Sequence, residues 1–426
     1  MSTASRHPAW GVACVTAGAL LAASAFRSTT GVLMEPIEHS TGWSRDVTSG
    51  AASLNLVLYG IAAPFTAALM QAWGVRRTVT WSLVIVGLAS AAVTLVGEPW
   101  QLWLLWGVFI GLGRGTMALT FGTIIANRWF VSHRGTVTGI FSAATAAGQV
   151  LFVPVIAMIA TGPGWRTASL VAGACSLVMA LLCLLFLRDR PADAGARAVG
   201  ATAASDAEAE DEGPASISMA VTALRSAGRH WSFWVLMLTF IVCGWSTNGT
   251  VVTHLAPAAH DHSMAPTTAA TLIGIIGIFD IVGTVASGWL TDRYDPRILL
   301  AIYYVTRGIS LVFINGLLGP SVDMPMWAFV VFYGLDWTAT VPPTVELCRR
   351  HFGLHASGVV FGWIYASHMI GAGIGASVSG ALRSGAASYA SAWLLTAGLC
   401  LVAGVLPMTM KRGPKAHDDD QIAVPL

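Results

Sequence analysis

Twelve apolar runs, each about as long as one membrane crossing, dominate this sequence of 426 residues. A hydrocarbon core about 30 Å thick requires about 20 apolar residues per helical crossing. The composition agrees, because 55% of the residues are hydrophobic and only 10% are charged. An ordinary soluble domain has roughly a quarter of its residues charged. The sequence therefore predicts an all-α membrane protein with twelve transmembrane helices, at residues 9–34, 49–70, 78–97, 101–124, 137–160, 167–187, 232–255, 268–290, 298–317, 325–346, 357–380 and 390–409.

The basic residues of the loops predict the orientation of the helices, because cytoplasmic loops are enriched in Lys and Arg. Of the 23 basic residues, 17 fall on one predicted face, three on the other and three inside spans. Both termini and the long central loop are therefore predicted to be cytoplasmic. The three basic residues of the opposite face are Arg45, Arg166 and Arg383, and the three inside spans are Arg27, Arg114 and Arg307.

The central loop divides the chain into two halves of six helices each. It contains the stretch ATAASDAEAEDEGPAS and few large apolar residues. Such a composition cannot bury a core and predicts a flexible linker. The expected organisation is a six-helix bundle at 1–187, a cytoplasmic linker at 188–231, a second six-helix bundle at 232–410 and a cytoplasmic tail at 411–426.

The two halves carry an internal sequence repeat, which is frequent in transporter folds. AALMQAWGVRR follows the second span and SGWLTDRYDPR follows the eighth, and they align at an offset of 221 residues. NRWFVSHRGTVTG and RRHFGLHASGVVFG align after the fourth and tenth spans, with Phe130 over Phe352 at an offset of 222. Two separate landmarks thus agree, and the halves are predicted to be pseudo-symmetric.

The segment SGWLTDRYDPR resembles the GxLxDRxGxRR loop of the major facilitator superfamily. The resemblance implies alternating access by rocking of the two halves, with this loop as a gating latch. Asp292 can face a helix N-terminus while arginines bind carbonyls or acids nearby. The plainer alternative is membrane anchoring by the arginines. The matching residues are Gly288, Leu290, Asp292, Arg293 and Arg297; the first copy keeps Gly74, Arg76 and Arg77 but has Gln71 in place of the acid.

Polar side chains inside the spans are candidates for function, since a charge in the membrane interior costs a few kcal/mol or more. At the repeat offset, Arg27 aligns with Asn248, Arg114 with Asp336, and Asp280 with Tyr59. In the superfamily, helices one, four, seven and ten line the central cavity. Arg27, Arg114, Asn248 and Asp336 lie in these helices, which predicts that they face the substrate path. The alternative is that one or both arginines only lock helices together.

Arg307 lies in the ninth span, which is usually peripheral, so an ion pair with Asp280 or Asp336 is the leading interpretation. His368 is a candidate substrate contact or proton acceptor, because its charge can change near neutral pH. An interhelical hydrogen bond explains it equally well. Asp280 is the other candidate for proton coupling. Uncharged donors for a substrate are available from Asn55, Tyr59 and Tyr365.

The charges of the spans favour an anionic cargo. The first half contributes two span arginines and no span Asp or Glu. An organic anion would neutralise these arginines, ideally through bidentate carboxylate contacts. The segments TGWSRDVTSGAASL, RWFVSHRGTVTG and FGWIYASH resemble a bacterial branch related to monocarboxylate and oxalate/formate carriers. Those carriers have an arginine in the eighth helix that this chain lacks, so their substrates are not carried over.

The sequence therefore predicts a secondary active transporter for a small carboxylate in the bacterial inner membrane, working as a monomer. Efflux of amphipathic compounds, or a solute receptor without transport, are the alternatives. An enzyme is not expected, because no HExxH motif, nucleotide-binding loop or nucleophile elbow is present. No cofactor or metal is expected either, because the six cysteines show no CxxC spacing. The scattered basic residues do not predict nucleic-acid binding.

Overall fold

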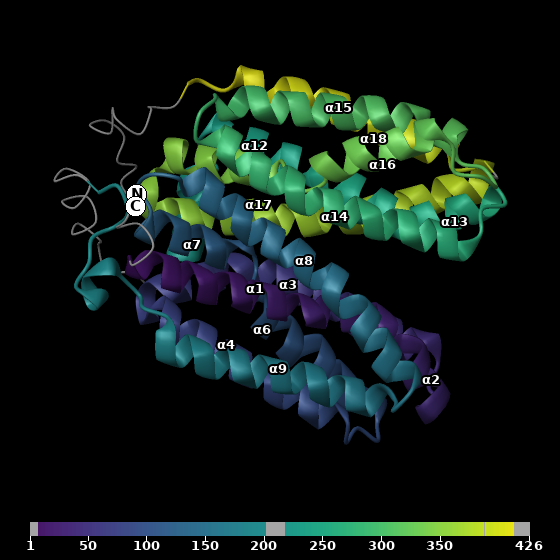
Figure 1. Ribbon diagram of the computed structural model, residues 1–426, viewed down its shortest axis with the longest axis horizontal. Helices are drawn as coiled ribbons and strands as arrows, with labels where there is room; N and C mark the ends of the chain where they lie inside the picture. The colour runs from purple at the N-terminus through teal and green to yellow at the C-terminus, as the bar shows by residue number, and fades with distance from the viewer. Residues whose placement is uncertain (1–6, 202–217, 387, 413–426) are drawn as a thin grey trace. The chain divides into compact units, whose positions relative to one another are not determined.

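The structure is a computed structural model that describes residues 7–201, 218–386 and 388–412 (Figure 1). The side chains at 25–31, 45–46, 266–267, 270 and 384–386 lie outside the description. The described residues fold almost entirely into helices. The chain forms two compact units, one of Met1–Arg134 with Ala144–Val221 and the other of Gly135–Ala143 with Thr222–Leu426.

The first unit packs long apolar helices in pairs. Helix α4 packs along α9, and α3 packs against the middle of the fourth predicted span (Figure 1). That span consists of four successive segments, one of them π-helical, with a turn at 117–118 before the last. An apolar core of the first unit includes Leu102, Trp106 and Trp165. The elements are α1 (Pro8–Val32), α2 (Met34–Thr41), α3 (Arg45–Trp73), α4 (Val75–Val93), α5 (Pro99–Leu102), η2 (Trp103–Ile110), α6 (Gly111–Thr116), α7 (Leu119–Trp129), α8 (Arg134–Thr161), of which Gly135–Ala143 belongs to the second unit, α9 (Trp165–Phe186) and η3 (Pro191–Ala194).

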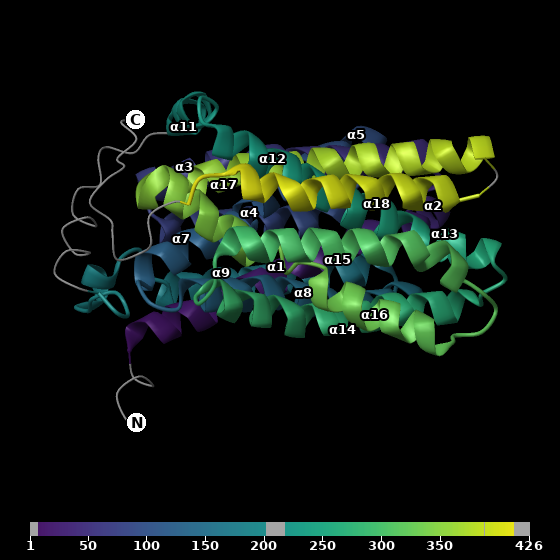
Figure 2. The same ribbon diagram turned by 90° about the horizontal axis from the view of Figure 1, so that it is seen from above.

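The second unit also pairs its helices. Helix α12 packs on α17, α14 on α16, and α15 on α18, the last pair side by side in Figure 2. Helix α17 contains a kink at Gly353, whose φ of 76° favours glycine. The elements are α11 (Met219–Ala227), which straddles the boundary of the units, α12 (Trp231–Gly244), η4 (Trp245–Val252), α13 (Thr253–Asp261), α14 (Pro266–Thr291), α15 (Pro296–Leu317), α16 (Met324–Asp336), α17 (Val341–Ala386), α18 (Ala390–Val405) and η5 (Leu406–Thr409).

All twelve predicted spans fall on helices, which confirms the predicted fold class. Within the described residues, nine helical stretches are long and apolar enough to cross a membrane. One of them, Met324–Arg383, covers the predicted spans 325–346 and 357–380. Helix α4 is not among the nine because Arg76 and Arg77 at its start lower its mean hydropathy.

Both ends of the predicted linker contain secondary structure. After α9 the chain turns through η3, and Val199 forms a parallel bridge with Phe130 in the loop between α7 and α8. The Val199 amide donates to the Trp129 carbonyl at 2.9 Å, and its carbonyl accepts from Val131 at 2.9 Å. The other end forms α11. These backbone hydrogen bonds need no large apolar side chain, so composition alone could not reveal them.

Glycines allow helices of the second unit to pack closely against one another. A Cβ added at Gly283 of α14 would run into the Leu335 carbonyl oxygen of α16. Gly274, on the same helix, has nothing within 4 Å of such an added Cβ. In a membrane, small residues let helix backbones approach closely and gain packing. The α14–α16 contact therefore depends on Gly283.

We expect Gly283→Ala to destabilise the protein by about 1–3 kcal/mol, because the new methyl group forces α14 and α16 apart. Gly274→Ala is the matched control, and we expect it to be neutral or stabilising by up to about 1 kcal/mol. Thermal unfolding of the purified protein in detergent measures both. Equal melting temperatures for the two variants would contradict the packing role of Gly283.

Proline at position 199 tests the structured start of the linker. Val199→Pro removes the amide that donates to Trp129, so we expect faster tryptic cleavage after the exposed Arg197. Val199→Thr keeps the amide and is the control. Unchanged cleavage in Val199→Pro would show that the bridge does not hold this segment in solution.

Candidate functional site

Arg114 is the central candidate of the first unit and is 4% exposed. One of its terminal nitrogens donates to Asn55 Oδ1 at 2.7 Å, and its guanidinium lies over the Tyr59 ring at 5.0 Å. Asn55 Nδ2 in turn donates to the Trp106 carbonyl at 2.6 Å. The structure thus brings together three residues that the sequence singled out. Asn55 and Tyr59 orient the guanidinium without adding a charge.

The local sequence explains how Arg114 reaches this position. Asn55 and Tyr59 are four residues apart on α3, so they share one face of that helix. A Cβ at Gly111 of α6 would lie 3.0 Å from the Asn55 carbonyl oxygen, so glycine lets α6 approach α3. Trp106 lies in η2, a π-helical segment, and such segments are frequent at functional sites.

Arg27 was predicted to act together with Arg114. Its backbone lies in α1, but its side chain lies outside the described residues. A role for Arg27 in substrate binding therefore stays a prediction.

Asn248 and His368 form the corresponding candidate in the second unit. The Asn248 amide nitrogen lies 3.2 Å from His368 Nε2. The His368 ring stacks on Tyr365, with centroids 5.7 Å apart and planes 9° apart, and the Phe240 ring lies at 5.1 Å. A Cβ at Gly371 would meet the Ile241 carbonyl oxygen, so glycine again brings the two helices together. This cluster combines an amide, an imidazole and aromatic faces.

Arg307 is almost fully buried and forms an ion pair with Asp336. Its Nε lies 2.6 Å from Asp336 Oδ2, and another nitrogen donates to the carbonyls of Asp336 and Trp337 at 2.6 and 2.9 Å. The sequence left the partner open between Asp280 and Asp336, and the structure places Asp336 there. Asp336 thus pairs with Arg307, and its predicted contact with the substrate stays a prediction.

Asp280 is buried beside the break between α16 and α17. Its Oδ1 accepts hydrogen bonds from Thr284 Oγ1 at 2.9 Å, Thr338 Oγ1 at 2.6 Å and the Thr338 amide at 2.9 Å. These three contacts hold the Asp280 carboxyl group beside the break between the two helices. Thr338 was missed at the level of sequence, where a threonine in a span gives no signal of its own.

Asp292 of the predicted latch caps the N-terminus of α8. Its carboxylate accepts from the amides of Gly135 and Thr136 at 2.7 and 2.9 Å and from Thr136 Oγ1 at 2.6 Å. Residues Gly135–Ala143 belong to the second unit, so these contacts of Asp292 lie within the second unit. A carboxylate at a helix N-terminus binds unpaired amides and is favoured by the helix dipole.

The arginines of the latch bind nearby groups. Arg293 donates to the Trp289 carbonyl at 3.1 Å and lies over the Trp289 ring at 3.9 Å. Arg297 pairs with Asp295 at 2.7 Å and donates to the Met410 carbonyl at 2.6 Å. The hydrogen bonds from Arg297 lower the pKa of Asp295. Gly288 packs closely on the backbone of Gly135.

The degenerate first copy of the motif has a different arrangement. The Arg76 amide donates to Asp189 Oδ1 at 2.7 Å, and its Nε donates to the Leu184 carbonyl at 2.7 Å. Arg77 is exposed. Asp189, just after α9, thus binds this loop. No sequence pattern predicted this contact, because Asp189 lies 113 residues from Arg76 along the chain.

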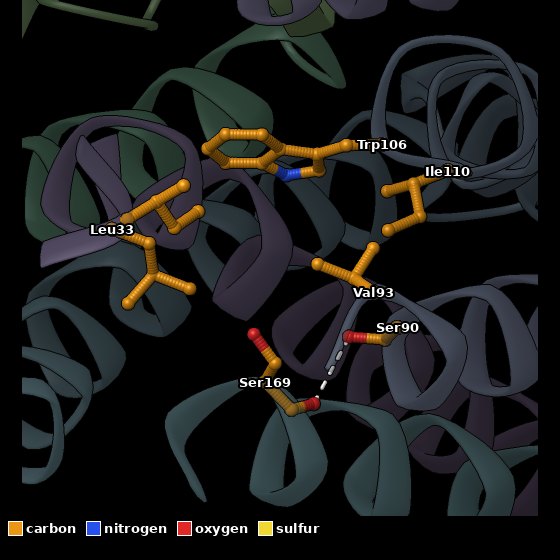
Figure 3. Close-up of a pocket in the computed structure, with 7 residues that line it drawn as sticks. Leu33, Ser90, Val93, Trp106, Ile110 and Ser169 are labelled. Carbon is orange, nitrogen blue, oxygen red and sulfur yellow. Dashed lines mark hydrogen bonds between the residues drawn. The ribbon is translucent and has the colours of Figure 1, made fainter. Parts of the chain in front are cut away.

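The first unit also contains a recess whose lining includes Trp106, the residue whose carbonyl binds Asn55 (Figure 3). Five of its seven lining residues are apolar, and Ser90 Oγ donates to the Ser169 carbonyl at 3.0 Å. In the part of the chain that the structure describes, no group of three or more His, Cys, Asp and Glu residues could hold a metal ion. The recess is lined by Leu33, Ile37, Ser90, Val93, Trp106, Ile110 and Ser169.

Comparisons with known proteins agree with this architecture. The uncharacterized MFS-type transporter YcxA of Bacillus subtilis (strain 168) is 21% identical over 407 residues, covering 92% of both chains. Monocarboxylate transporter 13 of Bos taurus is 26% identical over 364 residues, covering 84% of this chain and 78% of that protein. The crystal structure of the human organic anion transporter MFSD10 (TETRAN) shares the fold, with a TM-score of 0.71, 16% identity and coverage of 94% and 99%.

The family model described as Major Facilitator Superfamily matches residues 16–376 and, in a second match, 257–425. Its members are membrane carriers for small molecules and not enzymes. Because the match extends over most of the sequence, this chain belongs to the major facilitator superfamily.

Proposed function

We propose that this protein is a secondary active transporter that moves a small organic anion, a carboxylate, across the bacterial inner membrane by alternating access. It works as a monomer with both termini in the cytoplasm, and transport is proton-coupled or proceeds by exchange. The observation that carries the proposal is the buried Arg114 guanidinium, oriented by Asn55 and Tyr59.

The argument for an anion rests on charge. The predicted spans of the first half contain two arginines, Arg27 and Arg114, and no Asp or Glu in the sequence. A charge in the low-dielectric interior is costly, so an anion beside Arg114 would be stabilised there. The planar guanidinium suits a carboxylate, which it can bind through two parallel hydrogen bonds. The name of monocarboxylate transporter 13 supports the same substrate class.

The second unit supplies the groups that we assign to coupling and to further substrate contact. Asp280 and His368 are the candidate proton carriers, since both can change charge. Asn248, Tyr365 and His368 offer hydrogen bonds and aromatic faces to the cargo. We further propose that the Asp292 cap on α8 is a gating latch that is released during transport.

Substitution of Arg114 tests the anion site. Arg114→Lys keeps the charge but loses the bidentate geometry, so we expect kcat/KM for the transported acid to fall by about 10–100-fold. Arg114→Gln should abolish transport. Counterflow in proteoliposomes with a panel of labelled short carboxylic acids measures this. The control is Arg166→Gln, which alters an exposed arginine of the same unit.

Three results would speak against this proposal. Uptake of an acid that is unaffected in Arg114→Gln would remove the anion site. Saturable binding without flux would indicate a receptor. Transport of amphipathic compounds, with no acid moved, would support efflux.

Proton coupling is tested at Asp280. Asp280→Asn keeps an acceptor oxygen for Thr284 and Thr338 but cannot ionise. If Asp280 carries the proton, uptake in this variant no longer responds to an imposed pH gradient, while counterflow continues. Asp261→Asn, at an ion pair near the end of α13, is the control. If Asp280→Asn responds normally and His368→Gln does not, His368 is the carrier; a normal response in both variants favours exchange.

A further inference from the structure

The tenth predicted span is interrupted, and two charged side chains bind the freed backbone groups. Helix α16 ends at Asp336 and α17 begins at Val341. Arg307 donates to the carbonyls of Asp336 and Trp337, and Asp280 accepts from the Thr338 amide. Inside a membrane such groups have no water to bind, so the protein itself must satisfy them. The ion pair of Arg307 and Asp336 therefore holds the end of α16 in place.

The same pair is connected to η4. Another nitrogen of Arg307 donates to Ser246 Oγ at 3.2 Å, and Tyr333, one turn before Asp336 on α16, donates its hydroxyl to the Ser246 carbonyl at 3.1 Å. Ser246 Oγ also donates to the Cys243 carbonyl at 3.1 Å. Both polar groups of this serine are thus bound, and all of these residues are buried.

Ser246 is the second residue of η4, and Asn248 follows two positions later. A π-helix is rare and mostly persists as a short insertion in an α-helix. If η4 reverted to α-helical winding, each later side chain would rotate about the helix axis. The direction of Asn248 toward His368 therefore depends on the contacts that maintain the π-helical turn.

We propose that Arg307, Asp336, Tyr333 and Ser246 are positioning residues that maintain the π-helical winding of η4 and so direct Asn248 toward His368. They act through η4 and do not touch the substrate. This assigns Asp336 a role different from the substrate contact that the repeat predicted. The proposal rests on the proposed function only in treating Asn248 and His368 as a substrate site.

Two buried tyrosines offer a matched test. Tyr333→Phe removes the hydroxyl that binds Ser246 in η4, whereas Tyr304→Phe removes a hydroxyl that binds the Thr239 carbonyl in α12 at 2.7 Å. Both variants lose one buried hydrogen bond and keep the Arg307–Asp336 ion pair. We expect Tyr333→Phe to raise KM for the transported acid about fivefold with little change in kcat, and Tyr304→Phe to leave KM within about twofold.

Hydrogen–deuterium exchange gives a readout that needs no substrate. In Tyr333→Phe we expect the amides of η4, at 245–252, to exchange about fivefold faster, while those of α12 at 231–244 stay unchanged. Tyr304→Phe should show the reverse. Ser246→Ala should behave as Tyr333→Phe, and Ser246→Thr, which keeps the hydroxyl, should restore wild-type exchange and KM.

The outcomes separate this inference from the proposed function. If η4 exchanges no faster in Tyr333→Phe than in Tyr304→Phe, the positioning proposal is wrong, whatever the protein transports. If both tyrosine variants raise KM equally, the effect is a general loss of packing, and the proposal is again wrong. If the wild-type protein moves no organic acid but η4 responds as expected, the positioning of η4 stands and the transport proposal fails.

Discussion

Every polar backbone group in the hydrocarbon layer must find a partner within the protein, because no water is there to bind it. Continuous helices satisfy this requirement by themselves, and interrupted helices do not. The fourth span changes to π-helical winding in η2 and breaks between α6 and α7, and the tenth breaks after Asp336. Polar side chains bind backbone groups in the π-helical segment of the fourth span and at the break of the tenth. Asn55 binds the Trp106 carbonyl, while Arg307 and Asp280 bind the groups around Trp337.

This constraint explains why polar residues in the spans serve more than one purpose. Arg307 neutralises Asp336, binds two carbonyls and reaches Ser246. A buried ion pair contributes little net stability when its charges must be desolvated, and additional hydrogen bonds are needed to offset that cost. Arg307 has these hydrogen bonds. The main contribution of the ion pair is therefore to fix the geometry of α15, α16 and η4, and its net contribution to stability is small.

The two halves share a repeat in sequence but differ in the chemistry of matching positions. Arg114 aligns with Asp336, yet Arg114 contacts an amide and a tyrosine ring, whereas Asp336 lies in an ion pair. Asp292 caps α8, and the first copy has Gln71 at the equivalent position. An offset in sequence predicts similar depth in the membrane. It does not predict partners, because the side chains on the neighbouring helices differ between the two halves.

The sequence by itself determined the fold class, the number of spans and the family, because the length and apolarity of a span follow from the thickness of the membrane. It also named Asn55, Tyr59 and Arg114 as candidates, and the close approach of glycine-containing helices brings them together. Only the tertiary structure decided that Arg307 pairs with Asp336, that Thr338 donates hydrogen bonds to Asp280 and that Val199 forms a bridge with Phe130. These contacts join residues far apart in the chain, and they depend on how each helix is rotated and where it breaks. Helix packing determines both the rotation of each helix and the position of its breaks, and no local sequence pattern predicts them.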